Sequence, residues 1–209
     1  LAAMKTYLAG AKLLLQRKRP DEAQSSFQRI DDLIERMGAI TRQLKSYARK
    51  GGDAVEPMDV RDSVSSALSM MEPQLRRGDV EITASLPRDP VIVHADRIRL
   101  EQVLVNLLRN ALDATKATSN PEVQILVTVG DSVVVTVRDN GSGIEDLDNL
   151  FEPFYTTKAP GDGTGLGLAI SSGIVNDLGG RLTARNGQAG GAVFEITLPL
   201  AAQTTEAAE

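Results

Sequence analysis

Apolar residues recur at steps of three and four through the first fifty residues, which predicts two helices with one apolar stripe each. The stripes comprise Leu1, Met4, Leu8, Ala11 and Leu15, then Ile30, Leu33, Met37, Ile40, Leu44 and Tyr47. Pro20 and Asp21 mark the start of the second helix, because proline is tolerated in a first helical turn. This heptad spacing is typical of packed helices, and an isolated hairpin cannot bury both stripes. We therefore expect residues 1–50 to form a homodimeric four-helix bundle, the alternative being that the hairpin packs on its own globular domain.

A different pattern follows Gly51-Gly52-Asp53, where two glycines end the helical periodicity. The expected helices cover about 62–77, 96–115 and 165–178, and the expected strands cover 80–82, 91–93, 123–129, 133–137, 181–186 and 192–198. Helices and strands come in pairs, which favours an α+β fold in which helices cover one face of a mixed sheet. In the helix from Asp96, we expect Ile98, Val103, Leu107 and Leu108 to face the core. The predicted domains are thus 1–50 and 54–200, with a frayed tail at 201–209.

Composition and charge narrow the class of protein. The chain is 42% hydrophobic, has no cysteine, and contains no run of 18 apolar residues or basic-then-apolar secretory start. We expect a soluble globular piece that contacts neither membrane nor nucleic acid. Residues 1–50 carry 11 Lys and Arg against 5 Asp and Glu, whereas the rest carries 12 against 23. A basic first segment would suit an acidic partner, although both segments could simply be solvated helix faces.

The first of three motifs is Asn106-Leu-Leu-Arg-Asn110-Ala-Leu-Asp113, on the predicted helix 96–115. Spacings of four and three put Asn106, Asn110 and Asp113 on one side of that helix. A carboxamide oxygen there is a suitable hard ligand for Mg²⁺. Capping or solvent-facing asparagines are the alternative, which the core-like residues between them weaken.

The second motif is Asp139-Asn-Gly141-Ser-Gly143-Ile144, which ends a valine-rich strand. A carboxylate at that place can accept a hydrogen bond from the exocyclic amine of adenine, and the glycines let the backbone approach the base. Taken alone, the same residues could form an ordinary hairpin turn.

The third motif is Gly163-Thr164-Gly165-Leu166-Gly167-Leu168, at the start of a predicted helix. Glycines at a helix N-terminus expose N–H groups to phosphate oxygens. A dinucleotide-binding fold is excluded, because there the run follows the first strand of a βαβ unit. The loop Phe151-Glu-Pro-Phe154-Tyr155-Thr-Thr-Lys158 precedes it and is typical of a mobile lid, with aromatic anchors and a lysine that can reach a terminal phosphate.

In this order and spacing, the motifs resemble the nucleotide-binding boxes of bacterial sensor histidine kinases across about residues 96–170. The resemblance implies an α/β-sandwich ATPase domain of the histidine kinase, gyrase and heat-shock-90 type, with ATP and Mg²⁺ as cofactors. Asn110 would bind Mg²⁺, Asp139 would bind adenine, and the glycine segments would enclose ATP. The implied ATP-binding set is Asn106, Asn110, Asp113, Asp139, Gly141, Gly143, Ile144, Lys158, Gly163, Thr164, Gly165, Leu166, Gly167 and Leu168.

Within that family, the hairpin text and the Phe-Glu-Pro-Phe-Tyr-Thr-Thr-Lys lid resemble C4-dicarboxylate-transport and nitrogen-regulation sensors. This implies a dimeric hairpin that presents a phosphoacceptor histidine and docks an acidic receiver domain, in this subfamily that of an NtrC-type response regulator. It also implies a cytoplasmic location for this portion and an inner-membrane parent protein.

Two departures bear on mechanism. The family's His-Glu-(Leu/Phe)-x-x-Pro phosphoacceptor box is absent, and the only histidine, His94, is expected to be a structural residue on a strand. We therefore expect the fragment to bind ATP without phosphorylating itself. Related ATPases of the gyrase and heat-shock-90 kind place a glutamate where Asn106 stands, and asparagine cannot act as a general base. A purely conformational ATP clamp or a serine kinase remains the alternative class, but neither predicts a basic heptad hairpin beside three intact motifs.

Overall fold

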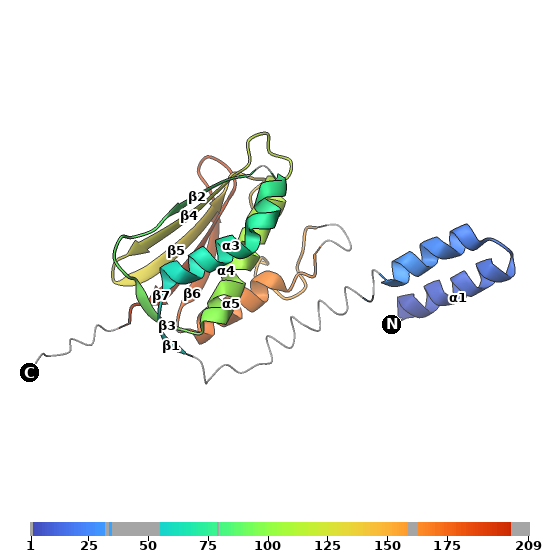
Figure 1. The fold of residues 1–209 in the computed structure, drawn as a ribbon, viewed down its shortest axis with the longest axis horizontal. Coiled ribbons are helices and arrows are strands. Elements are labelled where there is room, and N and C mark those ends of the chain that lie inside the picture. Colours follow the sequence, from blue (N-terminus) through green and yellow to red (C-terminus); the bar gives the residue numbers. More distant parts are fainter. Residues whose placement is uncertain (1, 32–33, 35–54, 79, 159–162, 202–209) are drawn as a thin grey trace, which may run out of the picture. The chain divides into compact units, whose positions relative to one another are not determined.

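The computed structural model describes residues 2–31, 34, 55–78, 80–158 and 163–201 (Figure 1). The chain divides into two compact units, one of Leu1–Arg49 with Phe154–Leu166 and one of Lys50–Pro153 with Gly167–Glu209. Within the described residues, every helix is too short or too polar to cross a lipid bilayer.

The first unit contains the first predicted helix and the described beginning of the second. Helix α1 spans Ala2–Gln16, and residues 20–31 are helical, starting at Pro20 as predicted. Arg29 of the second helix contacts Tyr7 of α1. Its Nη1 donates to the Tyr7 hydroxyl at 3.3 Å, and its guanidinium carbon lies 5.6 Å from the centroid of the Tyr7 ring. The part of the predicted second apolar stripe from Leu33 to Tyr47 lies outside the described residues.

Several apolar side chains of this unit face solvent. Alanines 11 and 23 are fully buried, but two members of the predicted first stripe, Leu8 and Leu15, are 42% and 48% exposed. Leu13, Phe27 and Ile34 are exposed to a similar degree. The part of the hairpin that the structure describes therefore does not bury its own apolar stripe.

The second unit is built on a five-stranded mixed sheet with the strand order β2-β4-β5-β7-β6. The strands are β2 (Glu81–Ser85), β4 (Glu122–Val129), β5 (Ser132–Asp139), β6 (Arg181–Asn186) and β7 (Ala192–Pro199). Strands β2 and β4 are parallel, and every other neighbouring pair is antiparallel. The predicted hairpin of β4 and β5 is confirmed, with Val129 opposite Val133 at the turn.

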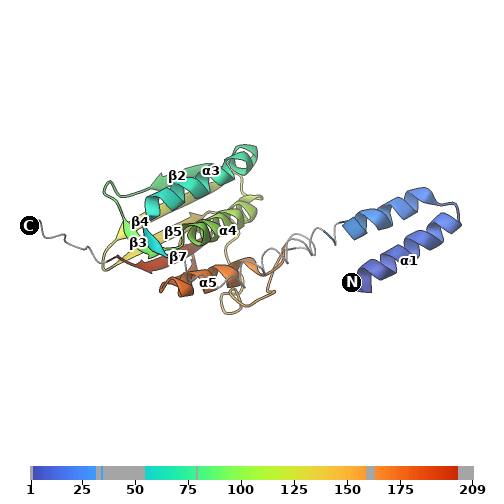
Figure 2. The ribbon, with the colours of Figure 1, turned by 60° about the horizontal axis from the view of Figure 1, so that its bottom comes forward.

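One face of this sheet is covered by α3 (Val60–Gly78), α4 (Arg97–Thr115) and α5 (Gly167–Asp177), as Figures 1 and 2 show. Both strands of the β4–β5 hairpin alternate: Val123, Ile125 and Val127 of β4 are buried, and so are valines 133, 135 and 137 of β5, while the residues between them are at least partly exposed. Leucines 100, 104, 107 and 108 of α4 are at most 1% exposed. Each such leucine contributes about 1.5–3 kcal/mol by leaving water, so α4 is held firmly at the centre of the layer.

A second, two-stranded sheet was not predicted. Strand β1 (Glu56–Asp59) pairs antiparallel with β3 (Ile92–Ala95). Strand β1 contains Pro57 and lacks apolar alternation, so it gives no strand signal, and proline is tolerated there because the strand has a single neighbour. Burial raises the pKa of the Asp59 carboxyl, but hydrogen bonds from Arg61 and the Val91 N–H outweigh it and hold that pKa below its ordinary value.

Two details of the predicted helices were wrong. Ile98 is 76% exposed instead of buried, because at 3.6 residues per turn it lies almost opposite Leu100, which faces the core. Helix α5 begins at Gly167, two residues later than predicted. The φ of Gly165 is +66°, which a right-handed helix cannot include.

Candidate functional site

The first motif lies along one side of α4. Asp96 caps this helix, and its carboxylate accepts a hydrogen bond from the Arg99 N–H at 3.2 Å. Asn106, Asn110 and Asp113 are part-buried, whereas Leu107 and Leu108 between them are in the core. The shared side predicted for the three polar residues is thus next to the buried side of α4.

The contacts of Asn106 and Asp113 connect α4 to its surroundings. The Asn106 Nδ2 donates to the Ser171 Oγ of α5 at 3.0 Å. Gly167, the first residue of α5, is in contact with the same carboxamide. Asp113 pairs with Lys116 at 2.7 Å. Asn106 therefore links the first motif to the third by direct contact.

Asp139 ends β5 and is 3% exposed. Its Oδ1 accepts hydrogen bonds from the N–H groups of Gly141, at 2.9 Å, and Ala192, at 3.2 Å. Its Oδ2 has no hydrogen-bond partner among the described residues. This oxygen is not completely buried, so it still reaches solvent. Burial raises the pKa of the Asp139 carboxyl, and the two backbone hydrogen bonds only partly oppose this rise. The arrangement presents one oriented acceptor oxygen from an otherwise buried carboxylate.

The loop after Asp139 rests on the C-terminal end of α4. Gly141 is in contact with the Ala114 backbone, and the Ser142 N–H donates to the Ala114 carbonyl at 3.3 Å. Asn140 turns away from α4: its Oδ1 accepts from the Glu122 N–H at 2.9 Å. Residues 106 and 114, which contact the third and second motifs, are roughly 12 Å apart along the helix at 1.5 Å per residue.

The second unit thus brings together nine of the predicted ATP-binding residues on α4, the loop after β5 and the start of α5. These are Asn106, Asn110, Asp113, Asp139, Gly141, Gly143, Ile144, Gly167 and Leu168. The other five, Lys158, Gly163, Thr164, Gly165 and Leu166, belong to the first unit.

Within that first unit, residues of the predicted lid lie against glycines of the third motif. The Phe154 N–H donates to the Gly165 carbonyl at 2.8 Å, and Gly163 is in contact with Thr156 and Lys158. Phe154 is 69% exposed with a φ of +70°, so the expectation that this aromatic anchors the lid was wrong. A tight turn beside Gly165 directs its ring outward instead of inward.

His94 also differs from expectation. It lies on β3 opposite Pro57 and is exposed, and its side chain makes no hydrogen bond among the described residues. It is therefore a solvent-facing strand residue, not a histidine held by structural partners. The reason is its place on a two-stranded sheet, where alternate side chains face water.

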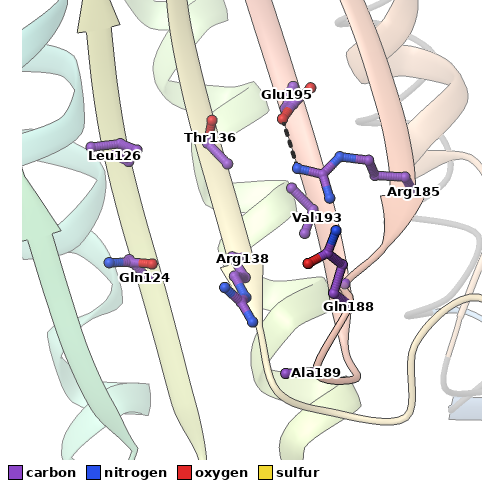
Figure 3. A pocket seen from close by; sticks show the side chains of 10 residues that line it. Gln124, Leu126, Thr136, Arg138, Arg185, Gln188, Ala189, Val193 and Glu195 are labelled. Carbon is purple, nitrogen blue, oxygen red and sulfur yellow. Dashed lines mark hydrogen bonds and ion pairs between the residues drawn. The ribbon is translucent and has the colours of Figure 1, made fainter.

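A hollow of about 500 Å³ opens on the face of the five-stranded sheet opposite the helices (Figure 3). Its lining includes Gln124, Thr136, Arg138 and the ion pair of Arg185 with Glu195, whose nitrogen and oxygen are 3.2 Å apart. None of the predicted ATP-binding residues lines it. The hollow is therefore separate from the site around Asp139.

Sequence reasoning missed two residues that hold this site. Ala192 orients the Asp139 carboxylate through its N–H, and Asn186 bonds the backbone of Ile144 on both sides. The only sequence signal was Asn186-Gly187, which indicates a turn. Nothing in the order of residues shows that this turn meets a loop 42 positions earlier.

Comparison with known proteins agrees with this geometry. Residues 95–202 match the family model described as histidine kinase-, DNA gyrase B- and HSP90-like ATPase. The chain is 39% identical to the C4-dicarboxylate transport sensor protein DctB of Pseudomonas aeruginosa over 202 residues, which are 95% of this chain and 33% of the relative. It is 37% identical to DctB of Rhizobium meliloti over 201 residues, 95% of this chain and 32% of that relative.

The chain thus spans about a third of the length of these two relatives. Among solved structures, the histidine kinase AdeS of Acinetobacter baumannii matches with a TM-score of 0.70 at 25% identity, covering 94% of this chain and 95% of that chain. The resemblance and the fold predicted from the three motifs are confirmed. The chain belongs to the histidine kinase-, DNA gyrase B- and HSP90-like ATPase family, and within it to the sensor histidine kinases.

Proposed function

We propose that this chain is the kinase core of a two-component sensor, which binds Mg-ATP and transfers the γ-phosphoryl group to a histidine on a dimerisation hairpin. The phosphoryl group then passes to an aspartate of a response regulator. The observation that carries the proposal is Asp139, a buried carboxylate with one oxygen fixed by two N–H groups and the other left for a ligand donor. An adenine amine supplies such a donor.

The proposed ATP site consists of the fourteen residues predicted above, with Asn110 as the protein ligand of Mg²⁺. Among the residues that the structure describes, no cluster of three or more His, Asp and Glu side chains could hold a metal ion by itself. A carboxamide site fits Mg²⁺, because this ion commonly completes its shell with phosphate oxygens and water. When bound, the metal would neutralise charge on the transferring phosphoryl group.

The absence of a general base favours phosphotransfer over hydrolysis. Asn106 stands where a glutamate would activate water, and its amide is engaged with Ser171. ATP would therefore persist until a histidine nitrogen attacks the γ-phosphorus, whose bond to the bridging oxygen breaks to release ADP. The enzyme's part is to position the two groups and to stabilise charge.

The domain boundaries proposed are 1–50 for the hairpin, 54–200 for the ATPase domain and 201–209 for a tail. The exposed leucines of the hairpin support a homodimer, since a second copy would bury them. Its surplus of basic residues supports docking of an acidic receiver domain, of the NtrC type in the subfamily resemblance. The names of the two DctB relatives support sensing of C4-dicarboxylates by the whole protein, with this portion cytoplasmic and the parent in the inner membrane.

Isothermal titration with a non-hydrolysable ATP analogue and Mg²⁺ tests the site. We expect binding by the wild-type chain and none by Asn110→Ala or Asp139→Ala, because each removes a group that touches the ligand. The matched control is Asn176→Ala, an exposed asparagine at the end of α5, which should bind like the wild type. Unchanged affinity in both site variants would refute the proposed site.

A second experiment tests phosphotransfer. His94 is the only histidine of the 209-residue chain, and it does not lie in an acceptor box. Incubation with radiolabelled ATP should therefore leave the chain unlabelled. Stable labelling of His94 would contradict the proposal. Steady ATP hydrolysis by this chain would contradict the role given to Asn106.

A further inference from the structure

Asn186, where β6 enters its turn to β7, is hydrogen-bonded to the loop that follows Asp139. The Oδ1 of Asn186 accepts from the Ile144 N–H at 2.7 Å, and its Nδ2 donates to the Ile144 carbonyl at 2.9 Å. One carboxamide thus satisfies both backbone groups of Ile144, as a neighbouring strand would. Residues 42 positions apart are held in register by this pair of hydrogen bonds.

The glycine of the second motif is shaped to this contact. Gly143 has a φ of +77°, which favours glycine, and a Cβ built there would lie 2.9 Å from the Asn186 Oδ1. Gly143 therefore admits Asn186 as well as providing the turn, and any side chain there would push the carboxamide away.

The opposite strand of the same hairpin reaches Asp139 itself, because Ala192 of β7 pairs with Asn186 of β6. The Ala192 N–H donates to the Asp139 Oδ1 at 3.2 Å. Gly191, with a φ of +73°, packs so closely on the Asp139 carbonyl that a Cβ would overlap it. One end of the hairpin thus holds both parts of the site: Ala192 of β7 holds the carboxylate, and Asn186 of β6 holds Ile144 in the loop of residues 141–144.

We propose that Asn186 is a positioning residue for nucleobase recognition. It holds residues 141–144 against the β6–β7 hairpin, so that the Asp139 Oδ2 keeps one orientation towards a purine that carries an exocyclic amine. This inference rests on the proposed function, in which Asp139 accepts from adenine. The ligand class is a 6-aminopurine nucleoside triphosphate, and Asn186 acts on it through Ile144 and the loop.

A purely structural role makes a different prediction. Asn186 and the Ile144 backbone groups are at the surface, so removing the side chain leaves no cavity in the core. If the contact only stabilised the fold, its loss would lower the unfolding temperature and weaken the binding of all nucleotides alike. If it positions the loop, its loss would weaken ATP more than an analogue without the amine.

The test measures the dissociation constants of ATP and inosine triphosphate, in which an oxygen replaces the amine, for the wild type and three variants. Asn186→Ala removes both hydrogen bonds, whereas Asn186→Asp keeps only the acceptor for the Ile144 N–H. The control is Gln188→Ala, an exposed residue of the same turn that does not bond the loop. Thermal unfolding and hydrogen exchange of the Ile144 amide are recorded for each protein.

We expect Asn186→Ala to lower the ratio of ATP to inosine-triphosphate affinity by about tenfold, the effect of roughly one hydrogen bond. Asn186→Asp should fall between it and the wild type, and Gln188→Ala should equal the wild type. The Ile144 amide should exchange faster in Asn186→Ala, while the unfolding temperature should match that of the control.

The inference is overturned if Asn186→Ala keeps the wild-type ratio, or if it lowers both affinities equally together with the unfolding temperature. Should Asn186→Ala fail to fold, an unchanged ratio in Asn186→Asp would overturn it as well. A wild-type chain that binds neither nucleotide would contradict the proposed function itself. This result differs from a failure of the Asn186 inference, in which the wild type still binds ATP.

Discussion

The two units of this chain treat their apolar residues in opposite ways. In the second unit, Leu100, Leu104, Leu107 and Leu108 of α4 are at most 1% exposed, and the sheet and two other helices cover them. In the first unit, Leu8, Leu13 and Leu15 are between 42% and 49% exposed. The ATPase unit therefore completes its core within one chain, whereas the described part of the helical unit leaves apolar side chains exposed, which the proposed dimer would cover. This difference suits a kinase in which nucleotide binding is local and phosphoacceptor presentation depends on assembly.

The largest expected effect comes from damaging the complete core. Leu107→Ala removes a fully buried side chain and should lower the free energy of unfolding by about 2–5 kcal/mol, as measured by urea denaturation. Leu147→Ala, at a position 43% exposed in the same unit, is the control and should change it by less than about 0.5 kcal/mol. Equal effects of the two changes would show that α4 is not at the centre of a packed core.

The next effect concerns the incomplete surface. Leu8→Asp combined with Leu15→Asp should weaken the proposed dimer by about 2–4 kcal/mol, because two apolar contacts are replaced by charges. Sedimentation equilibrium would measure the change, and ATP affinity should stay the same. Lys12→Ala, on the same helix, serves as the control. A wild-type chain that sediments as a monomer would mean that the exposed leucines have another purpose.

A smaller effect separates binding from stability at Asp139. Asp139→Asn can keep both backbone hydrogen bonds to Oδ1 but offers the adenine amine a donor, so ATP should bind about 10–100-fold more weakly. Because the folded-state pKa of Asp139 is raised, its contribution to stability is complete below the ordinary carboxyl pKa and falls as pH rises through the folded value.

Asp139→Asn has no carboxyl to ionise, so it does not lose stability as the pH rises. It should therefore unfold at a higher temperature than the wild type at pH 7. The advantage should shrink towards pH 4, and calorimetry at the two pH values measures it. A variant that is less stable at pH 7 and equal at pH 4 would reverse the assigned sign.

Local sequence patterns were sufficient for the elements with strong periodicity. The β4–β5 hairpin, the capped helix α4 and the mixed sheet followed from alternation, helical spacing and turn residues, because those signals arise within a few residues of each other. Strand β1 was missed because Pro57 and polar neighbours give no alternation, and its formation depends on pairing with β3. Ile98 was misplaced because a residue near a helix start can face either side until the neighbouring elements are known.

By itself, the sequence determined the identity and order of the three motifs, since the groups proposed to bind ATP, among them Asn110, Asp139 and the glycines, must be supplied by the chain's own residues. Only the tertiary structure decided that the Ala192 N–H donates to the Asp139 Oδ1 and that Asn186 bonds the backbone of Ile144. These contacts join residues about forty to fifty positions apart, and no local preference encodes a distance that arises only when separate strands pair.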